Sequence, residues 1–257
     1  MTCQILLEKK KKGGSYSPGK QRKVKMDRGK LIGIEGISGV GKTYFKTILE
    51  KHYANNSNIV FQNEITDEMH QGIQKQIFDI LSSGSNLFDF GMPMTETVLL
   101  VAIATHKEEM VIQPSLANGK LIVSDRSIDS ICIYQALTIA KKYGGCSLEL
   151  ANRIFDILSQ FCTVPVKTFL LKDDLEKCIE RAETRNCIQY SRDDIVLLTA
   201  ASILYGQYVE LHKERFEIID LLGLNTQEIK KQLINGINDI FFKGSENNKD
   251  HDGESLG

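Results

Sequence analysis

Eight consecutive residues near the start of the chain have the types and spacing that bind phosphate groups. Glycine permits positive φ, so successive backbone N–H groups can face a triphosphate at the start of a helix, whose dipole favours anions. We predict that the lysine of this loop reaches the β- and γ-phosphates and that its threonine binds Mg²⁺. The loop follows an apolar segment that ends at Glu35, and it matches G-x-x-x-x-G-K-[ST] without a gap: Gly36, Ile37, Ser38, Gly39, Val40, Gly41, Lys42 and Thr43.

The flanking sequence favours a nucleotide site over a chance glycine-rich turn. A strand pattern precedes the loop and a helical pattern, TYFKTILEKHY, follows it, which is the arrangement that the motif requires. We therefore expect a site for ATP with Mg²⁺. In phosphoryl transfer a protein positions donor and acceptor and neutralises the charge that spreads over the transferred group, so cations near each phosphate and an acid near the metal are needed.

A second candidate group stands at the end of another strand pattern. The short apolar segment KLIVSD ends in Asp125, and Arg126 follows it. A carboxylate here suits Mg²⁺, directly or through water, and an arginine suits bidentate contact with the phosphate of an acceptor. The alternative is that the two residues only cap the next helix. We predict a metal site at Thr43 and Asp125, and catalytic roles for Lys42, Asp125 and Arg126.

Three arginines, Arg181, Arg185 and Arg192, surround the polar segment NCIQYS between two helical patterns. Such a segment could fold over a bound nucleotide as a lid and bring arginines to the transferred group. The alternative is that any one of the three is an ordinary surface arginine. We predict that Arg185 and Arg192 act in catalysis and that Arg181 binds the donor nucleotide.

Strand patterns alternate with helical patterns along most of the chain, which predicts an α/β fold. Such alternation gives a parallel sheet covered by helices on both faces, with ligands at the carboxyl ends of the strands. Pro114 should bend the last turn of its helix. The predicted strands are 31–35, 58–62, 120–125, 166–171 and 216–220, and the predicted helices are about 43–54, 68–81, 94–117, 130–142, 148–162, 173–185, 195–214 and 226–240.

The two ends of the chain differ from its middle in charge and composition. Residues 1–30 contain ten Lys or Arg and two acids, a balance of +8, whereas the whole chain carries −1, which leaves −9 for the remainder. We predict a basic, disordered arm over 1–29, one P-loop domain over 30–242, and a polar, disordered tail over 243–257. The arm could bind nucleic acid or an anionic membrane, or be a dispensable extension, and its sequence leaves these open. Elsewhere nucleic acid is not an expected partner.

Cysteine and histidine usage favours an intracellular protein with reduced thiols. The six cysteines form no C-x-x-C pair, and the five histidines show no metal-ligand spacing. No apolar run approaches the roughly 20 residues that cross a bilayer, and the N-terminus is charged where a secretory signal is apolar. We expect a cytoplasmic location and no membrane partner.

Several segments together resemble the thymidylate kinase family of P-loop nucleoside-monophosphate kinases. They are the phosphate loop preceded by Glu35, VIQPSLANGKLIVSDR followed by SIDSICIYQ, LEKCIERAETR and the closing FEIID, and the resemblance runs from about Lys30 to Ile240. It implies a three-layer α/β/α fold with a five-stranded parallel sheet. It also implies Mg²⁺-dependent transfer of the ATP γ-phosphoryl group to a pyrimidine deoxynucleotide monophosphate, and commonly a homodimer.

The resemblance also places substrates on particular residues. The donor phosphates would lie on Gly36 to Thr43, the acceptor phosphate near Arg126, and the acceptor nucleoside near Tyr134 and Gln135. Glu64 is the residue retained from a family loop of Arg-Glu-Pro-Gly-Gly type, and we predict that it binds the acceptor. The resemblance also implies that the lid arginines are Arg181, Arg185 and Arg192.

The departures from the family pattern fall on the acceptor side. Ser38 stands where the family usually has an acid, Ala104 where it has an arginine that approaches the acceptor, Ser127 where it has an aromatic residue, and NEIT replaces the loop that contains Glu64. Thymidylate is the expected acceptor. A different nucleotide, a nucleoside or another small molecule is the alternative acceptor, and a non-catalytic protein that binds ATP or nucleic acid is a further one.

Overall fold

Strands and helices alternate along the chain, as the sequence predicts. The structure is a computed structural model, and it describes residues 28–64, 73–82 and 91–246. The strands are β1 Lys30–Glu35, β2 Ile59–Gln62, β3 Leu121–Asp125, β4 Lys167–Lys172 and β5 Phe216–Asp220. The helices are α1 Lys42–His52, α2 Ile73–Ser82, α3 Pro93–Lys107, the π-helix η2 Glu108–Ile112, α4 Gln113–Ala117, α5 Ile128–Tyr143, α6 Ser147–Leu158, α7 Leu175–Asn186, α8 Arg192–Leu211 and α9 Thr226–Glu246.

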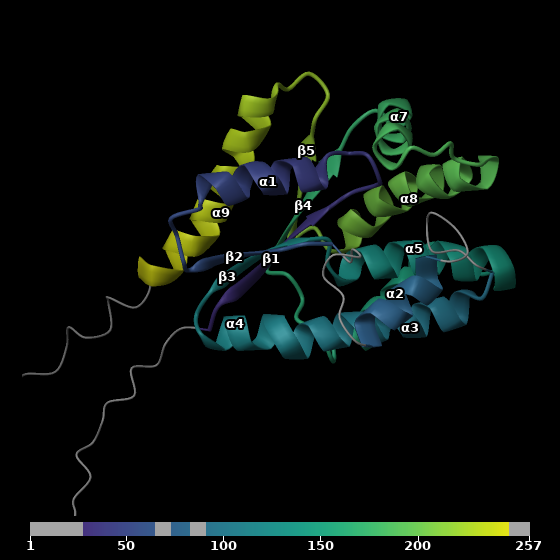
Figure 1. The fold of residues 1–257 in the computed structure, drawn as a ribbon, viewed down its shortest axis with the longest axis horizontal. Coiled ribbons are helices and arrows are strands. Elements are labelled where there is room, and N and C mark those ends of the chain that lie inside the picture. The colour runs from purple at the N-terminus through teal and green to yellow at the C-terminus, as the bar shows by residue number, and fades with distance from the viewer. Residues whose placement is uncertain (1–27, 65–72, 83–90, 247–257) are drawn as a thin grey trace, which may run out of the picture.

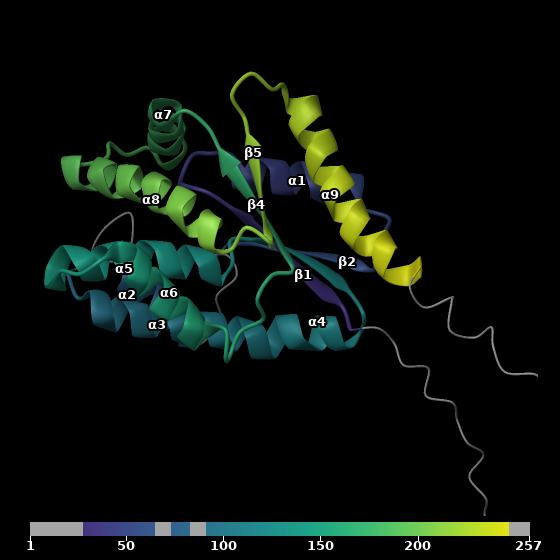
Figure 2. The same ribbon diagram turned by 180° about the vertical axis from the view of Figure 1, so that it is seen from behind.

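The strands form one parallel sheet between two layers of helices. Its order is β2-β3-β1-β4-β5. Helices α1 and α9 lie on one side of it, and α3, α4, α5 and α6 lie on the other (Figures 1 and 2). The apolar strand segments fit this arrangement, because a parallel strand is buried on both faces. The predicted three-layer fold with five parallel strands is confirmed.

The register of the sheet brings the candidate groups to one edge. In the central strand β1, Ile34 lies opposite Asp125 of β3, and Glu35 lies opposite Leu170 of β4. The phosphate loop therefore leaves β1 between the carboxyl ends of two neighbouring strands. This is where ligands bind in open parallel sheets.

The helix predicted over 94–117 is interrupted at a different place from the one expected. It forms α3, then the π-helical turn η2, then α4, so the irregularity lies before Pro114 rather than in the last turn. Proline has no N–H and its ring clashes with the carbonyl four residues earlier, and the wider π turn relieves that conflict. The turn comes directly after Lys107.

Other boundaries differ from the prediction by a few residues. Helix α9 begins at Thr226 as predicted but continues to Glu246, past the expected end at Ile240. The first part of the helix predicted over 68–81 lies outside the described residues, as do the basic arm up to residue 27 and the tail from residue 247. None of the described helices combines the length and apolar character that crossing a bilayer requires.

Candidate active site

The phosphate loop is folded around the ammonium group of its own lysine. Lys42 Nζ donates to the carbonyl oxygens of Gly36 at 3.0 Å and Ile37 at 2.9 Å, and the side chain is buried. Burial and, to a smaller extent, the neighbouring charge of Arg126 lower the pKa of Lys42 to about 8. A phosphate entering the loop would meet a cation that little water reaches, which strengthens their attraction.

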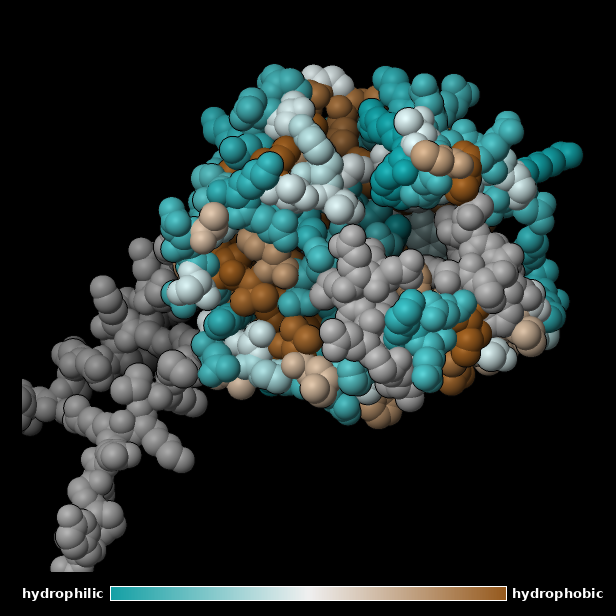
Figure 3. Space-filling view, viewed as in Figure 1, coloured by the Kyte–Doolittle hydropathy of each residue, from teal (hydrophilic) through white to brown (hydrophobic). Residues whose placement is uncertain are grey.

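One glycine of the loop allows a helix to approach closely. Gly39 has φ +80°, and a Cβ at that position would lie 1.8 Å from the carbonyl oxygen of Cys178 in α7. Only glycine fits both the backbone angle and the contact. The contact holds α7 beside the loop, and Figure 3 shows the surface hollowed below α7 and α8.

The two predicted metal-binding residues lie together. Thr43 Oγ1 donates to Asp125 Oδ2 at 2.7 Å. The other carboxylate oxygen of Asp125, Oδ1, is buried and has no hydrogen-bond partner among the described residues. A buried carboxylate oxygen without a partner beside a threonine hydroxyl is a donor set that suits Mg²⁺.

Arg126 is turned back toward the loop by its own backbone. Its φ of +67° is rare for a residue with a side chain and is often found at functional sites. The guanidinium donates to Glu64, to the carbonyl of Gly36 at 3.3 Å and to Ser130 Oγ at 3.0 Å. Although burial would raise the pKa of Glu64, the charges of Arg126 and Lys42 lower it, so the ion pair stays charged.

The residues predicted to hold the acceptor nucleoside lie beside this ion pair. The guanidinium of Arg126 lies over the ring of Tyr134, 5.7 Å from its centroid, within the range of a cation–π contact. The side chain of Gln135 is buried and its Oε1 accepts from Thr97 Oγ1 of α3 at 2.8 Å. Helix α3 therefore lines this part of the site together with α5.

The structure separates the three predicted lid arginines. Arg185 NH2 lies 3.4 Å from Ser38 Oγ, and Tyr190 OH lies at the same distance from that oxygen. Arg181 is half exposed and pairs with Asp173 at 2.7 Å. Arg192 is exposed and makes no hydrogen bond or ion pair within the described part of the chain. The structure thus brings Arg185 into contact with the phosphate loop, whereas Arg181 pairs with Asp173 and the side chain of Arg192 contacts none of the described loop residues.

A buried polar network supports the site from behind. Glu35 accepts from the backbone N–H and the hydroxyl of Ser127 at 2.7 and 2.8 Å, from Ser130 Oγ at 2.6 Å and from Tyr205 OH at 2.9 Å. The Ser127 hydroxyl also lies 3.0 Å from Asp129 Oδ2 and accepts from the Asp129 backbone N–H, which caps α5. Ser127, which stands where the family has an aromatic residue, is therefore bound within this network and caps α5.

Glu35 gives the stability of the protein a pH dependence. Burial raises the pKa of Glu35 above its ordinary value of 4.5, and the charge of Asp129 raises it further. Above pH 4.5 the unfolded chain releases this proton while the folded chain keeps it, so the free energy of unfolding falls as pH rises toward the raised pKa. Urea titrations at pH 5 and pH 8 measure this effect. Between these pH values the free energy of unfolding should fall more for wild type than for Glu35→Gln, by up to about 1.4 kcal/mol per pH unit. Equal losses in the two proteins would contradict this assignment.

Three further residues lie at this edge of the sheet but were not among the predicted ones: Lys46 on α1, Asn63 after β2 and Lys107 at the end of α3. Lys46 of α1 donates to the side chain of Asn63 and to Glu50 at 2.9 Å. Lys107 Nζ lies 3.3 Å from the carbonyl of Asn63 and 3.1 Å from Ser124 Oγ. The available signal was helical spacing, because Lys46 follows Lys42 by four residues and so shares its helix face.

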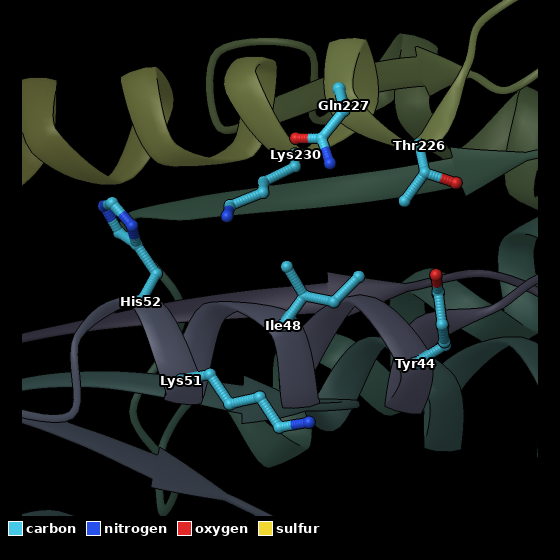
Figure 4. Close-up of a pocket in the computed structure, with 7 residues that line it drawn as sticks. All are labelled: Tyr44, Ile48, Lys51, His52, Thr226, Gln227 and Lys230. Atoms are coloured by element: carbon cyan, nitrogen blue, oxygen red, sulfur yellow. The ribbon is translucent and has the colours of Figure 1, made fainter.

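A groove of about 520 Å³ between α1 and α9 is separate from this site. It is lined by Tyr44, Ile48, Lys51 and His52 of α1 and by Thr226, Gln227 and Lys230 of α9 (Figure 4). None of the predicted site residues lines it. The candidate active site is therefore the edge of the sheet where the phosphate loop, Asp125 and Arg126 meet.

Comparison with known proteins identifies the relatives of this chain. A thymidylate kinase family model matches residues 34–232. The probable thymidylate kinase of Methanococcoides burtonii is 28% identical over 83% of this chain and 98% of its own length, and the thymidylate kinase of Bartonella henselae is 28% identical over 82% and 95%.

Solved structures share the fold. Thymidylate kinase from Ehrlichia chaffeensis has a TM-score of 0.59 and 18% identity over 82% of this chain and 99% of its own. The enzyme from Candida albicans has a TM-score of 0.62 and 22% identity over 83% and 92%. Since the family model spans most of the chain, including both the phosphate loop and the residues that face it, this protein belongs to the thymidylate kinase family.

Proposed function

We propose that this protein transfers the γ-phosphoryl group of ATP to thymidylate, yielding dTDP and ADP. Its family consists of nucleoside-monophosphate kinases. The observation that carries the proposal is that the phosphate loop and the Arg126–Glu64 pair meet at the carboxyl ends of adjacent strands. Sites for two phosphorylated substrates would then lie side by side, as direct transfer requires.

The residues of the site suggest how each substrate is held. Backbone N–H groups of the loop and Lys42 would bind the donor phosphates, and Arg126 would bind the acceptor phosphate with Glu64 fixing its orientation. An oxygen of the acceptor phosphate attacks the γ-phosphorus, and the bond from that phosphorus to the β–γ bridging oxygen breaks, leaving ADP. Arg185 is placed to neutralise charge on the transferred group. The predicted roles of Arg181 in donor binding and of Arg192 in catalysis are part of this proposal.

We also propose that Mg²⁺ takes part, held by Thr43 and Asp125. The unpartnered buried oxygen of Asp125 supports this choice, and phosphate and water oxygens would supply the remaining ligands. In the described part of the chain, no group of three or more His, Cys, Asp or Glu side chains could hold a metal ion. The nucleotide would therefore have to supply some of the ligands. When bound, the metal would neutralise charge on the donor phosphates.

An acceptor screen with the purified full chain, ATP and Mg²⁺ tests the proposed function. ADP release and the diphosphate product should be measured for dTMP, dUMP, dCMP, dAMP, dGMP and thymidine. We expect the highest kcat/KM with dTMP. Turnover of other acceptors with none on dTMP would overturn the choice of thymidylate, and ATP binding without turnover of any acceptor would favour a non-catalytic role.

Two further proposals concern the assembly of the protein and its location in the cell. Three exposed apolar side chains lie on α3 and η2: Met94, Val98 and Met110. They support a homodimer formed through this surface. Sedimentation velocity should then give twice the single-chain mass of 28.9 kDa, and a single-chain mass would contradict it. Free cysteines among the described residues, and ATP as donor, support the cytoplasm as location.

A further inference from the structure

We infer that Lys107 binds the phosphate of the acceptor nucleotide and so sets the preference of this protein for a nucleotide over a nucleoside. The inference rests on the proposed function, since it assigns a further residue to the same acceptor site. It begins from the position of the lysine. Lys107 is the last residue of α3, and its ammonium reaches the ends of two strands, at Asn63 after β2 and Ser124 in β3.

Both neighbours of this ammonium stand directly before a predicted acceptor or metal residue. Asn63 precedes Glu64, which pairs with Arg126, and Ser124 precedes Asp125. Asp125 and Glu64 are close enough that their charges act on the lysine. Lys107 therefore lies at the same strand ends as the arginine that we assign to the acceptor phosphate.

No carboxylate among the described residues forms an ion pair with Lys107, although the charges of Asp125 and Glu64 act on it from a greater distance. The two hydrogen bonds of Lys107 go to a backbone carbonyl and a hydroxyl. Lys46, by contrast, pairs with Glu50, and Arg126 pairs with Glu64. A partly buried cation without a carboxylate is costly by itself, and a doubly charged phosphate would offset that cost.

Helix α3 also has the reach that this role needs. Thr97 marks the nucleoside end of the site through its hydrogen bond to Gln135. Lys107 follows it by ten residues, which is about 15 Å along the helix axis. One helix can therefore present a group to the nucleoside and a cation to the phosphate. Ala104, one turn before Lys107, offers no charge of its own.

Binding of dTMP and thymidine to the full chain, measured by calorimetry without ATP, tests the inference. Lys107→Met should weaken dTMP binding by about ten- to a hundredfold and change thymidine binding less than twofold, because only dTMP carries the phosphate. Lys107→Arg should retain most of the dTMP affinity. The matched control is Lys51→Met, an exposed lysine on α1, which should leave both affinities unchanged. Equal losses for dTMP and thymidine, or no loss for either, would overturn the inference.

A measurement on the wild-type protein covers the case in which Lys107→Met does not fold. Mass spectrometry after mild acetylation should show Lys107 protected by dTMP and not by thymidine, with Lys51 modified equally in both. Equal modification of Lys107 under the two conditions would contradict the inference. If the acceptor screen selects another nucleotide, the proposed function fails, while the same comparison with that nucleotide and its nucleoside still tests Lys107.

Discussion

Lys42→Ala should reduce kcat at least about a hundredfold, and up to about a thousandfold, while the protein remains folded. The ammonium of Lys42 lies within the loop on the carbonyls of Gly36 and Ile37, in a position that water barely reaches. Its removal would take away the charge that, in the proposed mechanism, faces the donor phosphates where charge develops during transfer. A coupled assay of ADP release, at saturating ATP and acceptor, measures the effect.

Two companion variants separate charge from packing at this position. Lys42→Met keeps much of the side-chain volume without the charge, so it should lose nearly as much activity as Lys42→Ala. Lys51→Met removes a lysine from the exposed side of the same helix and should retain wild-type turnover. Thermal unfolding should show both Lys42 variants folded at the assay temperature. Turnover of Lys42→Ala near the wild-type rate would refute the role assigned to the phosphate loop.

The largest expected effect on stability comes from Arg215. Its guanidinium forms two bonds to Asp129, NH1 to Oδ2 at 2.8 Å and NH2 to Oδ1 at 2.7 Å, and both side chains are buried. The ring of Phe216 lies 4.6 Å and that of Phe155 5.0 Å from the guanidinium carbon. Arg215→Met should lower the free energy of unfolding by about 3 to 5 kcal/mol, because it leaves the Asp129 carboxylate buried without its cation. Urea unfolding at pH 7 measures this.

An exposed ion pair on the same sheet provides the control for Arg215. Lys167 of β4 and Glu217 of β5 pair at 2.9 Å but remain partly exposed to water. Glu217→Gln should therefore change stability by less than about 1 kcal/mol. Combining Asp129→Asn with Arg215→Met should cost less than the sum of the two single changes, because the unpaired charge is gone. A loss below about 1 kcal/mol for Arg215→Met alone would show that the buried pair contributes little.

The Arg215 pair also connects stability with the active site. Asp129 contacts Ser127, which contacts Glu35, and Ser130 bonds both Glu35 and Arg126. The positive φ of Arg126 directs its side chain toward this network. The left-handed backbone at a non-glycine residue is held in place by surrounding contacts of this kind.

Much of the fold followed from local sequence patterns. Each of the five strands was expected within a residue or two of where it lies, because short apolar runs bounded by turn residues specify buried parallel strands. The prediction was less accurate where two local preferences compete. In the helix over 94–117, the apolar pattern continues through Pro114, and the conflict is resolved by a π turn that the pattern does not reveal.

The sequence by itself determined the phosphate loop, since eight adjacent residues contain both the glycines that set the backbone and the lysine that supplies the charge. It also determined that Asp125 ends a strand and that Arg126 follows it. Only the tertiary structure decided which distant residues join them. Lys107 meets Asn63 across 44 positions and Arg215 meets Asp129 across 86. Such pairs depend on strand order and register, which arise from packing the whole sheet against its helices and leave no local pattern in the chain.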